Sequence, residues 1–515
     1  MTPIIDAVAT YARSQAARLA CVDLESGRRW SYADFDRDID KVAAWLVEEL
    51  GPGSGERVAT LAKNNADILM LQIAAARAGA VFVPLNWRLS AHEIEQLVTD
   101  CAATLLFHDR EFADAAARAG SAAGSRLLDW SDRYLVDFAA SAPNAPPHAA
   151  RRGFDEPATF LYTSGTSGRP KGVVLSEANA FFSCLNFIFG NQVSRDSTFL
   201  CDMPMFHTAG IFAAVRTPIY AGGTVLISKG FDTQVTLARL VDPALGVTHY
   251  FSVPQMAQRI WQEPGFDPAT LHHLQKWAVG GAPSPPAQIQ RFLSAGIRMS
   301  DGFGMSETGS NFCMPMDDMQ LAHDKAGSCG LPYIAMQVRI VGDDGEDVAV
   351  GETGELWLAG PSVTSGYWNN PEETARAFVD GWFRTGDAAM RDADGFYYLV
   401  DRRKDMFISG GENVYPVEVE SAIAELDDVA EAAVIGVPDS KWGEVGRAYV
   451  IPRAGHSLEA EAVRAHVAGR LARYKVPATF VITDTIPRTA SGKVQKHLLK
   501  ARAAQEMQDK EEEDA

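Results

Sequence analysis

Short apolar runs alternate with helix-like stretches over much of the chain. Between residues 57 and 108, the runs RVATLA, AVFVPL and ATLLFH predict strands, and the stretches 66–77 and 91–99 between them predict helices. A second series follows, in which TFLCDMP, GTVLIS and VTHYFSVP predict strands, and Ser176 is placed to cap a helix that carries residues 181–189. The alternation predicts an α/β fold class with two layered α/β subdomains.

The pattern changes twice further along the chain. From residue 337 to 399, short strands separated by Gly and Asp turns predict a small subdomain resembling a β-barrel. After Asp401, a helix near 417–426, the strands VAEAAVIGV and RAYVIP, a helix near 459–473 and the strand ATFVIT predict a separate α+β domain. We therefore predict a large N-terminal domain over residues 1–400, a small C-terminal α+β domain over 401–505, and a disordered acidic tail over 506–515.

Composition and charge narrow the class of protein. The 515 residues are 47% hydrophobic and carry a formal net charge of −19, which disfavours binding to nucleic acid or to an anionic membrane. The six cysteines have no metal-ligand spacing, which favours reduced thiols. The N-terminus predicts an amphipathic helix rather than a signal peptide, and no apolar run approaches the roughly 18 residues of a membrane span. We expect a cytoplasmic protein without membrane insertion, and a homodimer is compatible with the sequence.

The most informative segment is YTSGTSGRPKGV, residues 162–173. Its glycines allow backbone N–H groups to approach an oxyanion, its hydroxyl groups add neutral donors, and Lys171 adds positive charge. The segment does not match G-x-x-x-x-G-K-[ST], and the chain has neither G-x-G-x-x-G nor G-x-S-x-G, so P-loop kinases, Rossmann dehydrogenases and serine hydrolases are disfavoured. The pattern favours a phosphate-binding loop over a flexible surface linker.

This segment resembles the phosphate-binding signature of the adenylate-forming superfamily, which includes acyl-CoA synthetases, luciferases and the adenylation domains of peptide synthetases. Further matches follow in the family's order, from about Ser31 to Leu499: GGAP (280–283), DGFGMSET (301–308), RTGD (384–387), DRRKD (401–405) and PRTASGK (487–493). The chain looks closest to stand-alone acyl-CoA ligases. The resemblance implies that the small domain is mobile and turns between adenylation and thioesterification about a hinge at Lys404.

The resemblance also implies roles for residues of the large domain. Phe303 would stack on adenine, Ser306 would touch the α-phosphate, and Glu307 would ligate a Mg²⁺ ion that bridges the nucleotide phosphates. Read alone, FGMSET is only a helix start capped by Ser306. His207, within MPMFHTAG, would position the substrate in a segment whose aromatic residue gates the acyl pocket, although a lone histidine is usually structural. A histidine that is frequent in relatives is absent from the stretch SEAN, residues 176–179.

Other roles fall on the end of the large domain and on the small domain. Asp387 would accept hydrogen bonds from both ribose hydroxyls, and Arg402 would contact the ribose. Gly410 and Gly411 would pass close to the pantetheine of coenzyme A. Lys493 would offset the repulsion between carboxylate and ATP and stabilise charge on the five-coordinate α-phosphorus. Alone, TGD is a turn and DRRKD a solvated basic cluster.

The complete set of predicted site residues is as follows. The predicted catalytic residues are Lys493, Thr166, Glu307 and His207, and the predicted metal ligands are Glu307 and Thr166. The predicted acyl pocket consists of Phe206, His207, Ile211, Val253, Gly281, Met305 and Phe312. The predicted nucleotide and coenzyme A contacts are Thr163, Ser164, Gly165, Thr166, Ser167, Gly168, Lys171, Gly281, Ala282, Pro283, Asp301, Gly302, Phe303, Gly304, Met305, Ser306, Asp387, Arg402, Gly410, Gly411 and Lys493.

These residues together predict an AMP-forming acid–thiol ligase. ATP, with Mg²⁺, would activate a fatty, alicyclic or aromatic acid as an acyl adenylate with release of pyrophosphate, and coenzyme A would then accept the acyl group. Two alternatives stay open. An amide synthetase would pass the acyl adenylate to an amine or amino acid, and a noncatalytic protein would only bind the nucleotide.

Overall fold

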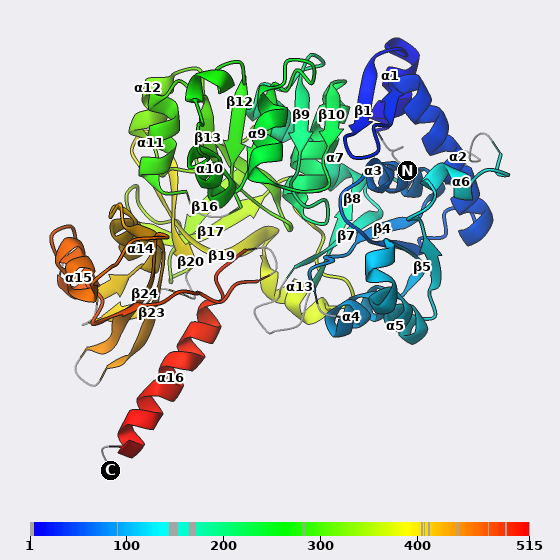
Figure 1. Cartoon of the computed structure of the whole chain (residues 1–515). Helices are drawn as coiled ribbons and strands as arrows, with labels where there is room; N and C mark the ends of the chain where they lie inside the picture. Colours follow the sequence, from blue (N-terminus) through cyan, green and yellow to red (C-terminus); the bar gives the residue numbers. More distant parts are fainter. Residues whose placement is uncertain are drawn as a thin grey trace. The chain divides into compact units, whose positions relative to one another are not determined.

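The computed structural model describes residues 5–89, 91–143, 153–163, 171–281, 284–402, 405, 407–409, 412–439, 442–471, 473–489 and 492–513. The chain divides into two compact units (Figure 1). The first unit consists of Met1–Gly281, Ile289–Val338 and Leu358–Phe383, and the second of Ala282–Gln288, Arg339–Trp357 and Arg384–Ala515.

One sheet of the first unit has six strands in the order β6-β5-β3-β4-β7-β8. All neighbours are parallel except β7 and β8, which form an antiparallel hairpin. Its strands are β3 (Arg57–Leu61), β4 (Val81–Pro84), β5 (Ala103–His108), β6 (Arg126–Asp129), β7 (Pro157–Thr163) and β8 (Lys171–Ser176). The three predicted strands are confirmed as β3, β4 and β5, and the two predicted helices as α3 (Ala66–Ala78) and α4 (Ala91–Cys101). A further helix, α5 (Ala113–Ala123), follows β5.

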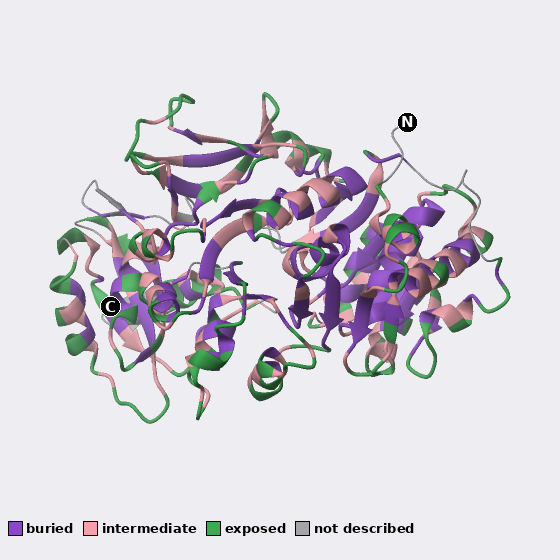
Figure 2. Ribbon diagram, turned by 90° about the horizontal axis from the view of Figure 1, so that it is seen from above, coloured by how far each residue is buried: buried purple, intermediate pink, exposed green. Residues whose placement is uncertain are grey.

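The second sheet of the first unit has nine strands in the order β15-β14-β13-β12-β11-β9-β10-β1-β2. The run from β13 to β1 is parallel throughout. Its strands are β1 (Leu19–Asp23), β2 (Arg29–Ser31), β9 (Thr198–Cys201), β10 (Thr224–Ile227), β11 (His249–Ser252), β12 (Lys276–Val279), β13 (Met299–Met305), β14 (Gly309–Cys313) and β15 (Leu331–Pro332). Figure 2 shows that buried residues are concentrated along such strands, as expected where both faces of a parallel sheet are covered.

Several helices of the first unit begin after a capping side chain. Ser176 accepts a hydrogen bond from the backbone N–H of Asn179 at the start of α7 (Glu177–Gly190), which confirms the predicted cap. The predicted amphipathic N-terminal helix is also confirmed as α1 (Ala7–Ser14). Other helices that the structure describes are α2 (Tyr32–Leu50), α6 (Leu135–Phe138), the π-helix η3 (Ala209–Arg216), α8 (Thr217–Ala221), α9 (Thr233–Val241), α10 (Pro254–Trp261), α11 (Pro286–Ser294), which begins in the second unit, α12 (Met319–Asp324) and α13 (Pro371–Ala377).

A five-stranded sheet follows, as the Gly and Asp turns predicted. Its path is β16-β17-β19-β18, and β20 pairs with β19. The strands are β16 (Gln337–Val341), β17 (Thr353–Ala359), β18 (Phe378–Val379), β19 (Trp382–Arg391) and β20 (Tyr397–Arg402).

The C-terminal part of the second unit has the predicted mixed composition of helices and strands. A sheet of β21 (Phe407–Ser409), β22 (Glu412–Val414), β23 (Val429–Asp439), β24 (Gly443–Pro452) and β25 (Thr479–Ile482) is accompanied by α14 (Pro416–Ala424), α15 (Ala460–Ala468) and α16 (Lys496–Glu513). Val419, Val434 and Val463 belong to one buried apolar core between them. The backbone of α16 is helical through Glu513, and the disordered tail remains a prediction, as do the domain boundaries at 400 and 505.

Two further expectations can be compared with the structure. All six cysteines are buried and none forms a disulfide, in agreement with the predicted reduced thiols. Among the described helices, none combines the length and the apolar composition that a membrane crossing requires.

Candidate active site

The carboxyl ends of four parallel strands bring separate predicted segments to one edge of the nine-stranded sheet. The chain leaves β9 toward His207, β11 toward Val253, β12 toward Gly281 and β13 toward Ser306. Because neighbouring parallel strands end at the same edge, these segments lie beside one another. A Cβ atom built on Gly281 would lie 3.7 Å from Val253 Cγ1. The Thr208 hydroxyl, beside His207, donates to the Ser306 hydroxyl over 3.3 Å.

The DGFGMSET segment forms a β-hairpin instead of a helix start. Strand β13 continues through Phe303 and pairs with the antiparallel β14, so the reading of Ser306 as a helix cap is wrong. A Cβ atom on Gly304 would approach the Gly309 carbonyl oxygen to 2.5 Å, and Gly309 has a φ of +70°. The two glycines therefore permit the close hairpin that carries Glu307 in its turn.

Glu307 is a buried carboxylate held from two sides. Its side chain accepts a hydrogen bond from the Tyr367 hydroxyl over 3.2 Å, and its backbone carbonyl accepts one from the N–H of Thr364 over 2.7 Å. Within the described ranges, no group of three or more His, Cys, Asp or Glu could hold a metal ion. Mg²⁺ is commonly held by one or two carboxylates together with substrate phosphates, so a single carboxylate of this kind fits such an ion.

The predicted phosphate loop is the connection between β7 and β8. Thr163 pairs directly with Lys171 across the two strands, so these two residues flank the predicted loop. Ser164, Gly165, Thr166, Ser167 and Gly168 lie outside the described residues. Of the predicted loop residues, Thr163 and Lys171 are therefore the two that the structure describes.

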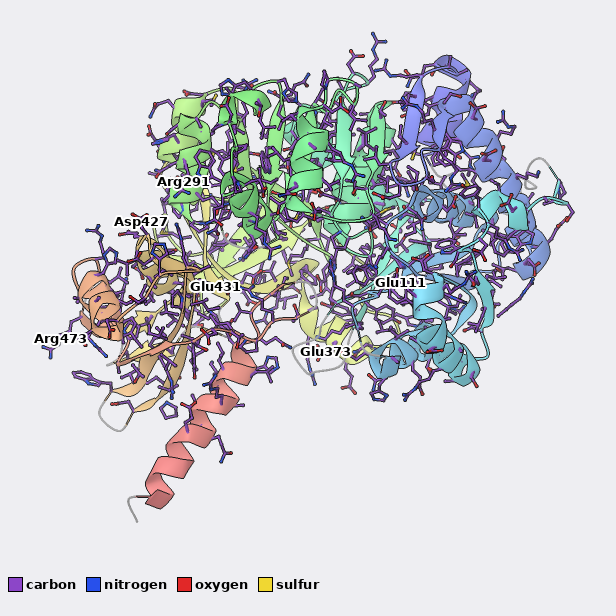
Figure 3. All side chains as sticks on the ribbon, viewed as in Figure 1. Glu111, Arg291, Glu373, Asp427, Glu431 and Arg473 are labelled. Atoms are coloured by element: carbon purple, nitrogen blue, oxygen red, sulfur yellow. The ribbon has the colours of Figure 1, made fainter. Side chains whose placement is uncertain are left out.

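Lys171 has a defined environment at the end of this loop. It forms an ion pair with Glu373 of α13, a residue labelled in Figure 3, and its Nζ lies 5.2 Å from the centroid of the Tyr367 ring. The hydrogen bond from Lys171 lowers the pKa of the Glu373 carboxyl below its usual value. Lys171 is only 12% exposed, so its charge is partly desolvated and well suited to a phosphate.

The predicted acyl-pocket residues differ in their surroundings. His207 precedes the π-helix η3 and its carbonyl accepts from the N–H of Ile211 over 3.0 Å. Ile211 and Phe312 are fully buried. The Phe206 ring lies 4.5 Å from the His207 ring, and Trp87 meets Phe206 edge-on at 6.4 Å. A π-helix is rare and is often found at functional sites.

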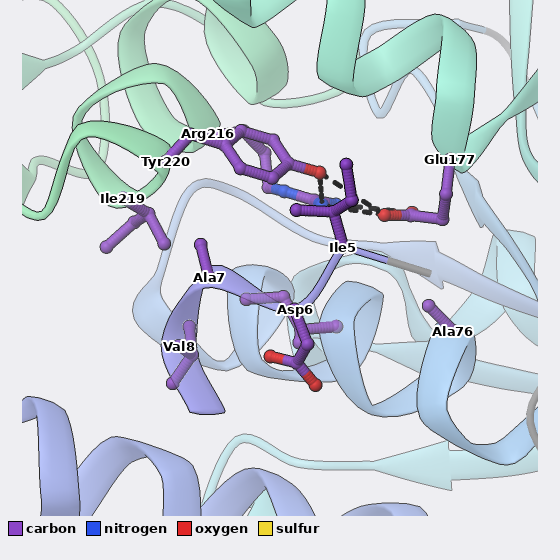
Figure 4. Close-up of a pocket in the computed structure, with 10 residues that line it drawn as sticks. Ile5, Asp6, Ala7, Val8, Ala76, Glu177, Arg216, Ile219 and Tyr220 are labelled. Atoms are coloured by element: carbon purple, nitrogen blue, oxygen red, sulfur yellow. Dashed lines mark hydrogen bonds and ion pairs between the residues drawn. The ribbon is translucent and has the colours of Figure 1, made fainter. Parts of the chain in front are cut away.

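The far end of η3 is anchored by an ion pair beside a small cavity (Figure 4). Arg216, the last residue of η3, donates to Glu177, the first residue of α7. None of the predicted site residues lines this cavity, which is formed by Ile5, Asp6, Ala7, Val8, Ile73, Ala76, Glu177, Arg216, Ile219 and Tyr220. The cavity therefore lies beside the ion pair that anchors the π-helix, and it is separate from the predicted active-site residues.

Three of the remaining predicted residues lie in the second unit. Asp387 of β19 is 9% exposed and stands directly opposite Arg402 of β20 in the antiparallel register, so the backbone brings this pair together. Lys493 is exposed, and its N–H donates to the Thr489 hydroxyl over 3.2 Å in a tight loop that precedes α16. The predicted residues Ala282, Pro283, Lys404, Gly410 and Gly411 lie outside the described residues.

Other predicted residues lie on the same hairpin, and two residues that contact the predicted site were not predicted from the sequence. Asp301, Gly302 and Met305 all belong to β13, and Asp301 is buried. Sequence reasoning did not find Tyr367 or Glu373, since each lies far along the chain from its partner. No local pattern relates them to Glu307 or Lys171, and only the pairing of the chain with β8 brings them there.

A buried carboxylate at Glu307 and a partly buried lysine beside the loop between β7 and β8, on this α/β fold, are the features expected of an adenylate-forming enzyme. The chain belongs to the AMP-binding enzyme family, whose model matches residues 8–368, and the model of the AMP-binding enzyme C-terminal domain matches residues 418–493.

Known proteins are similar to this chain over nearly its whole length. The chain is 38% identical to a feruloyl-CoA synthase from Amycolatopsis sp, over 91% of this chain and 93% of that protein. It is 35% identical to an indoleacetate–CoA ligase from Aromatoleum aromaticum, covering 91% and 92% respectively. The structure of an o-succinylbenzoate coenzyme A synthetase from Bacillus subtilis, in complex with ATP and magnesium ion, matches with a TM-score of 0.85 and 28% identity, over 96% and 99% of the two chains.

These findings confirm four predictions. The superfamily and the α/β fold class are as expected. The enzyme class, an AMP-forming acid–thiol ligase that uses ATP, Mg²⁺ and coenzyme A, also agrees with the family and its characterised members. The roles of single residues remain predictions.

Proposed function

We propose that this enzyme activates an aromatic carboxylic acid as its acyl adenylate and transfers the acyl group to coenzyme A. The main observation behind this proposal is that Tyr367 contacts both Glu307 and Lys171. The contacts bring the carboxylate that would bind Mg²⁺ close to the lysine that flanks the predicted phosphate loop. The aromatic preference is supported by the feruloyl and indoleacetate ligases among the relatives. The aromatic rings of Trp87 and Phe206 beside His207 suit a planar substrate.

In the first half-reaction, an oxygen of the substrate carboxylate attacks the α-phosphorus and the bond to pyrophosphate breaks. Glu307 would hold Mg²⁺ on the phosphates, Ser306 would donate to the α-phosphate, and Lys171 would bind the leaving pyrophosphate. Lys493 would stabilise the charge that develops on the phosphorus. Asp387 would fix the ribose through its two acceptor oxygens.

In the second half-reaction, the sulfur of coenzyme A attacks the acyl carbonyl while its thiol proton passes to solvent, the bond to phosphate breaks, and AMP leaves with the electron pair. Gly410 and Gly411 would border the thiol's path, and Lys404 would act as the hinge between the two reactions.

We also propose a large domain over 1–400, a small domain over 401–505, a homodimer and a cytoplasmic location. Size-exclusion chromatography with light scattering tests the dimer.

The experiment that tests the proposed function is acid-dependent release of pyrophosphate. Ferulate, indoleacetate, decanoate and cyclohexanecarboxylate are each incubated with Mg·ATP, with and without coenzyme A, and the products are weighed by mass spectrometry. We expect kcat/KM to be highest for an aromatic acid and the product to be its coenzyme A thioester. A faster reaction with decanoate would refute the aromatic preference. An amide formed with added amines, without any thioester, would refute the acceptor.

A further inference from the structure

One side chain of the first unit contacts two predicted functional groups at once. The Tyr367 hydroxyl donates to Glu307 Oε1 over 3.2 Å, while the face of its ring lies 5.2 Å from Lys171 Nζ. Lys171 is in turn paired with Glu373, six residues after Tyr367 in the chain. A cation over an aromatic face and a hydrogen bond from the same phenol are independent contacts, so one ring fixes the spacing of both groups.

The backbone leaves this ring little freedom to move. Residues on either side of Tyr367 pair with β8: the N–H of Trp368 donates to the carbonyl of Gly172 over 2.7 Å, and the N–H of Val174 donates to the carbonyl of Gly366 over 3.0 Å. The segment around Tyr367 thus extends the edge of the six-stranded sheet. Its phenol is presented from a strand-like backbone rather than from an isolated loop.

The Tyr367 phenol donates a hydrogen bond to the Glu307 carboxylate and does not compete with it for a metal ion. The hydroxyl is the donor in its contact with Glu307 Oε1, because a phenol keeps its proton at neutral pH and an ionised carboxylate only accepts. A carboxylate has about four lone-pair sites on two oxygens, and the hydrogen bond from Tyr367 occupies one of them. The contact restrains the rotation of the Glu307 side chain and leaves it able to bind a cation.

We propose that Tyr367 is a positioning residue that sets the orientation of Glu307 for Mg²⁺ and its distance from Lys171. The inference rests on the proposed function, in which Glu307 ligates the Mg²⁺ that accompanies ATP. Tyr367 itself takes no part in bond making. Its removal weakens the metal-dependent half-reaction and leaves thioesterification unchanged.

The test is the Mg²⁺ dependence of Tyr367→Phe, which retains the ring over Lys171 and removes only the hydroxyl. Adenylation is followed as pyrophosphate release with ATP fixed and Mg²⁺ varied. We expect the half-saturating Mg²⁺ concentration to rise about 10-fold, as loss of a hydrogen bond to a charged group predicts, while kcat at saturating Mg²⁺ changes little. The reaction of supplied acyl adenylate with coenzyme A is expected to be unaffected. Titration calorimetry gives a second readout, with weaker binding of Mg·ATP and unchanged binding of ATP in EDTA.

Tyr398→Phe is a matched control, because the Tyr398 hydroxyl also donates to a carboxylate, that of Asp392, over 3.2 Å. We expect its Mg²⁺ dependence to equal that of the wild-type enzyme. An equal shift in both variants, or none in Tyr367→Phe, would overturn the proposal. Glu307→Gln distinguishes failure of the proposed function from failure of the positioning role. If Glu307→Gln retains wild-type adenylation, the proposed role of Glu307 is wrong. If it abolishes adenylation while Tyr367→Phe behaves as wild type, only the positioning role is wrong.

Discussion

Arg216 and Glu177 form a buried ion pair in which Nη2 and Oε2 are 2.8 Å apart and each side chain is 5% exposed. The pair joins the last residue of the π-helix η3 to the first residue of α7. The Tyr220 hydroxyl lies against both charged groups. The element that begins beside His207 is therefore fixed at its far end by charges that water cannot solvate.

Glu177→Gln is expected to lower the free energy of unfolding by about 3–5 kcal/mol, because it leaves the Arg216 charge buried without its partner. Chemical denaturation followed by circular dichroism measures the change. The double variant Arg216→Met, Glu177→Leu should recover most of the loss, since it removes both charges. The exposed pair of Arg37 and Asp34 is the control, and Asp34→Asn should change stability by less than about 1 kcal/mol. Similar losses in the buried and exposed variants would contradict this account.

Lys493→Ala is expected to slow adenylation by about 10² or more, since it removes a cation from two reacting anions. Thioesterification of supplied acyl adenylate should be spared. Single-turnover assays of each half-reaction measure the effect, with Lys500→Ala, a neighbouring lysine on α16, as the control. An equal loss in both half-reactions would argue against a lysine that serves adenylation alone.

Gly304→Ala is expected to reduce kcat/KM of adenylation by at least about 10-fold, because the misplacement of reacting groups by about 1 Å costs this much or more. The added methyl group would stand 2.5 Å from the Gly309 carbonyl oxygen and must open the hairpin that carries Ser306 and Glu307. At Gly230, a Cβ atom meets no other atom within 4 Å, so Gly230→Ala should retain activity. Full activity in Gly304→Ala would show that the hairpin can yield without consequence.

Asp202→Asn is expected to alter the pH dependence of stability. Burial raises the pKa of Asp202 to about 6, partly offset by hydrogen bonds from Thr236 and Tyr250. Because the folded pKa exceeds the unfolded value of about 4, the stability that this group contributes is complete below pH 4 and is lost as the pH rises through 6. Thermal unfolding of both proteins between pH 4 and 7 should show the wild type losing about 3 kcal/mol relative to the variant. A constant difference between the two proteins across this range would exclude the ionisation of Asp202.

The sequence by itself determined the class of fold and many of its strands and helices, and it indicated a phosphate-binding site. Apolar runs such as RVATLA had the length and flanking turns of β3, and Ser176 capped α7, because these depend on neighbours a few residues away. Glycines, hydroxyls and Lys171 indicated a phosphate-binding loop, and the resemblance of the ordered motifs to the adenylate-forming superfamily implied adenylation. Local propensity failed at Ser306, where pairing of β13 with β14 replaced the helix start by a hairpin.

Only the tertiary structure decided which distant residues support the motifs. Tyr367 reaches Glu307, and Glu373 reaches Lys171, because the chain near Tyr367 pairs with β8. Glu177 and Arg216 look in sequence like ordinary surface charges, yet folding buries both. Such contacts depend on backbone pairing and burial across tens to hundreds of residues, for which the sequence has no local periodicity.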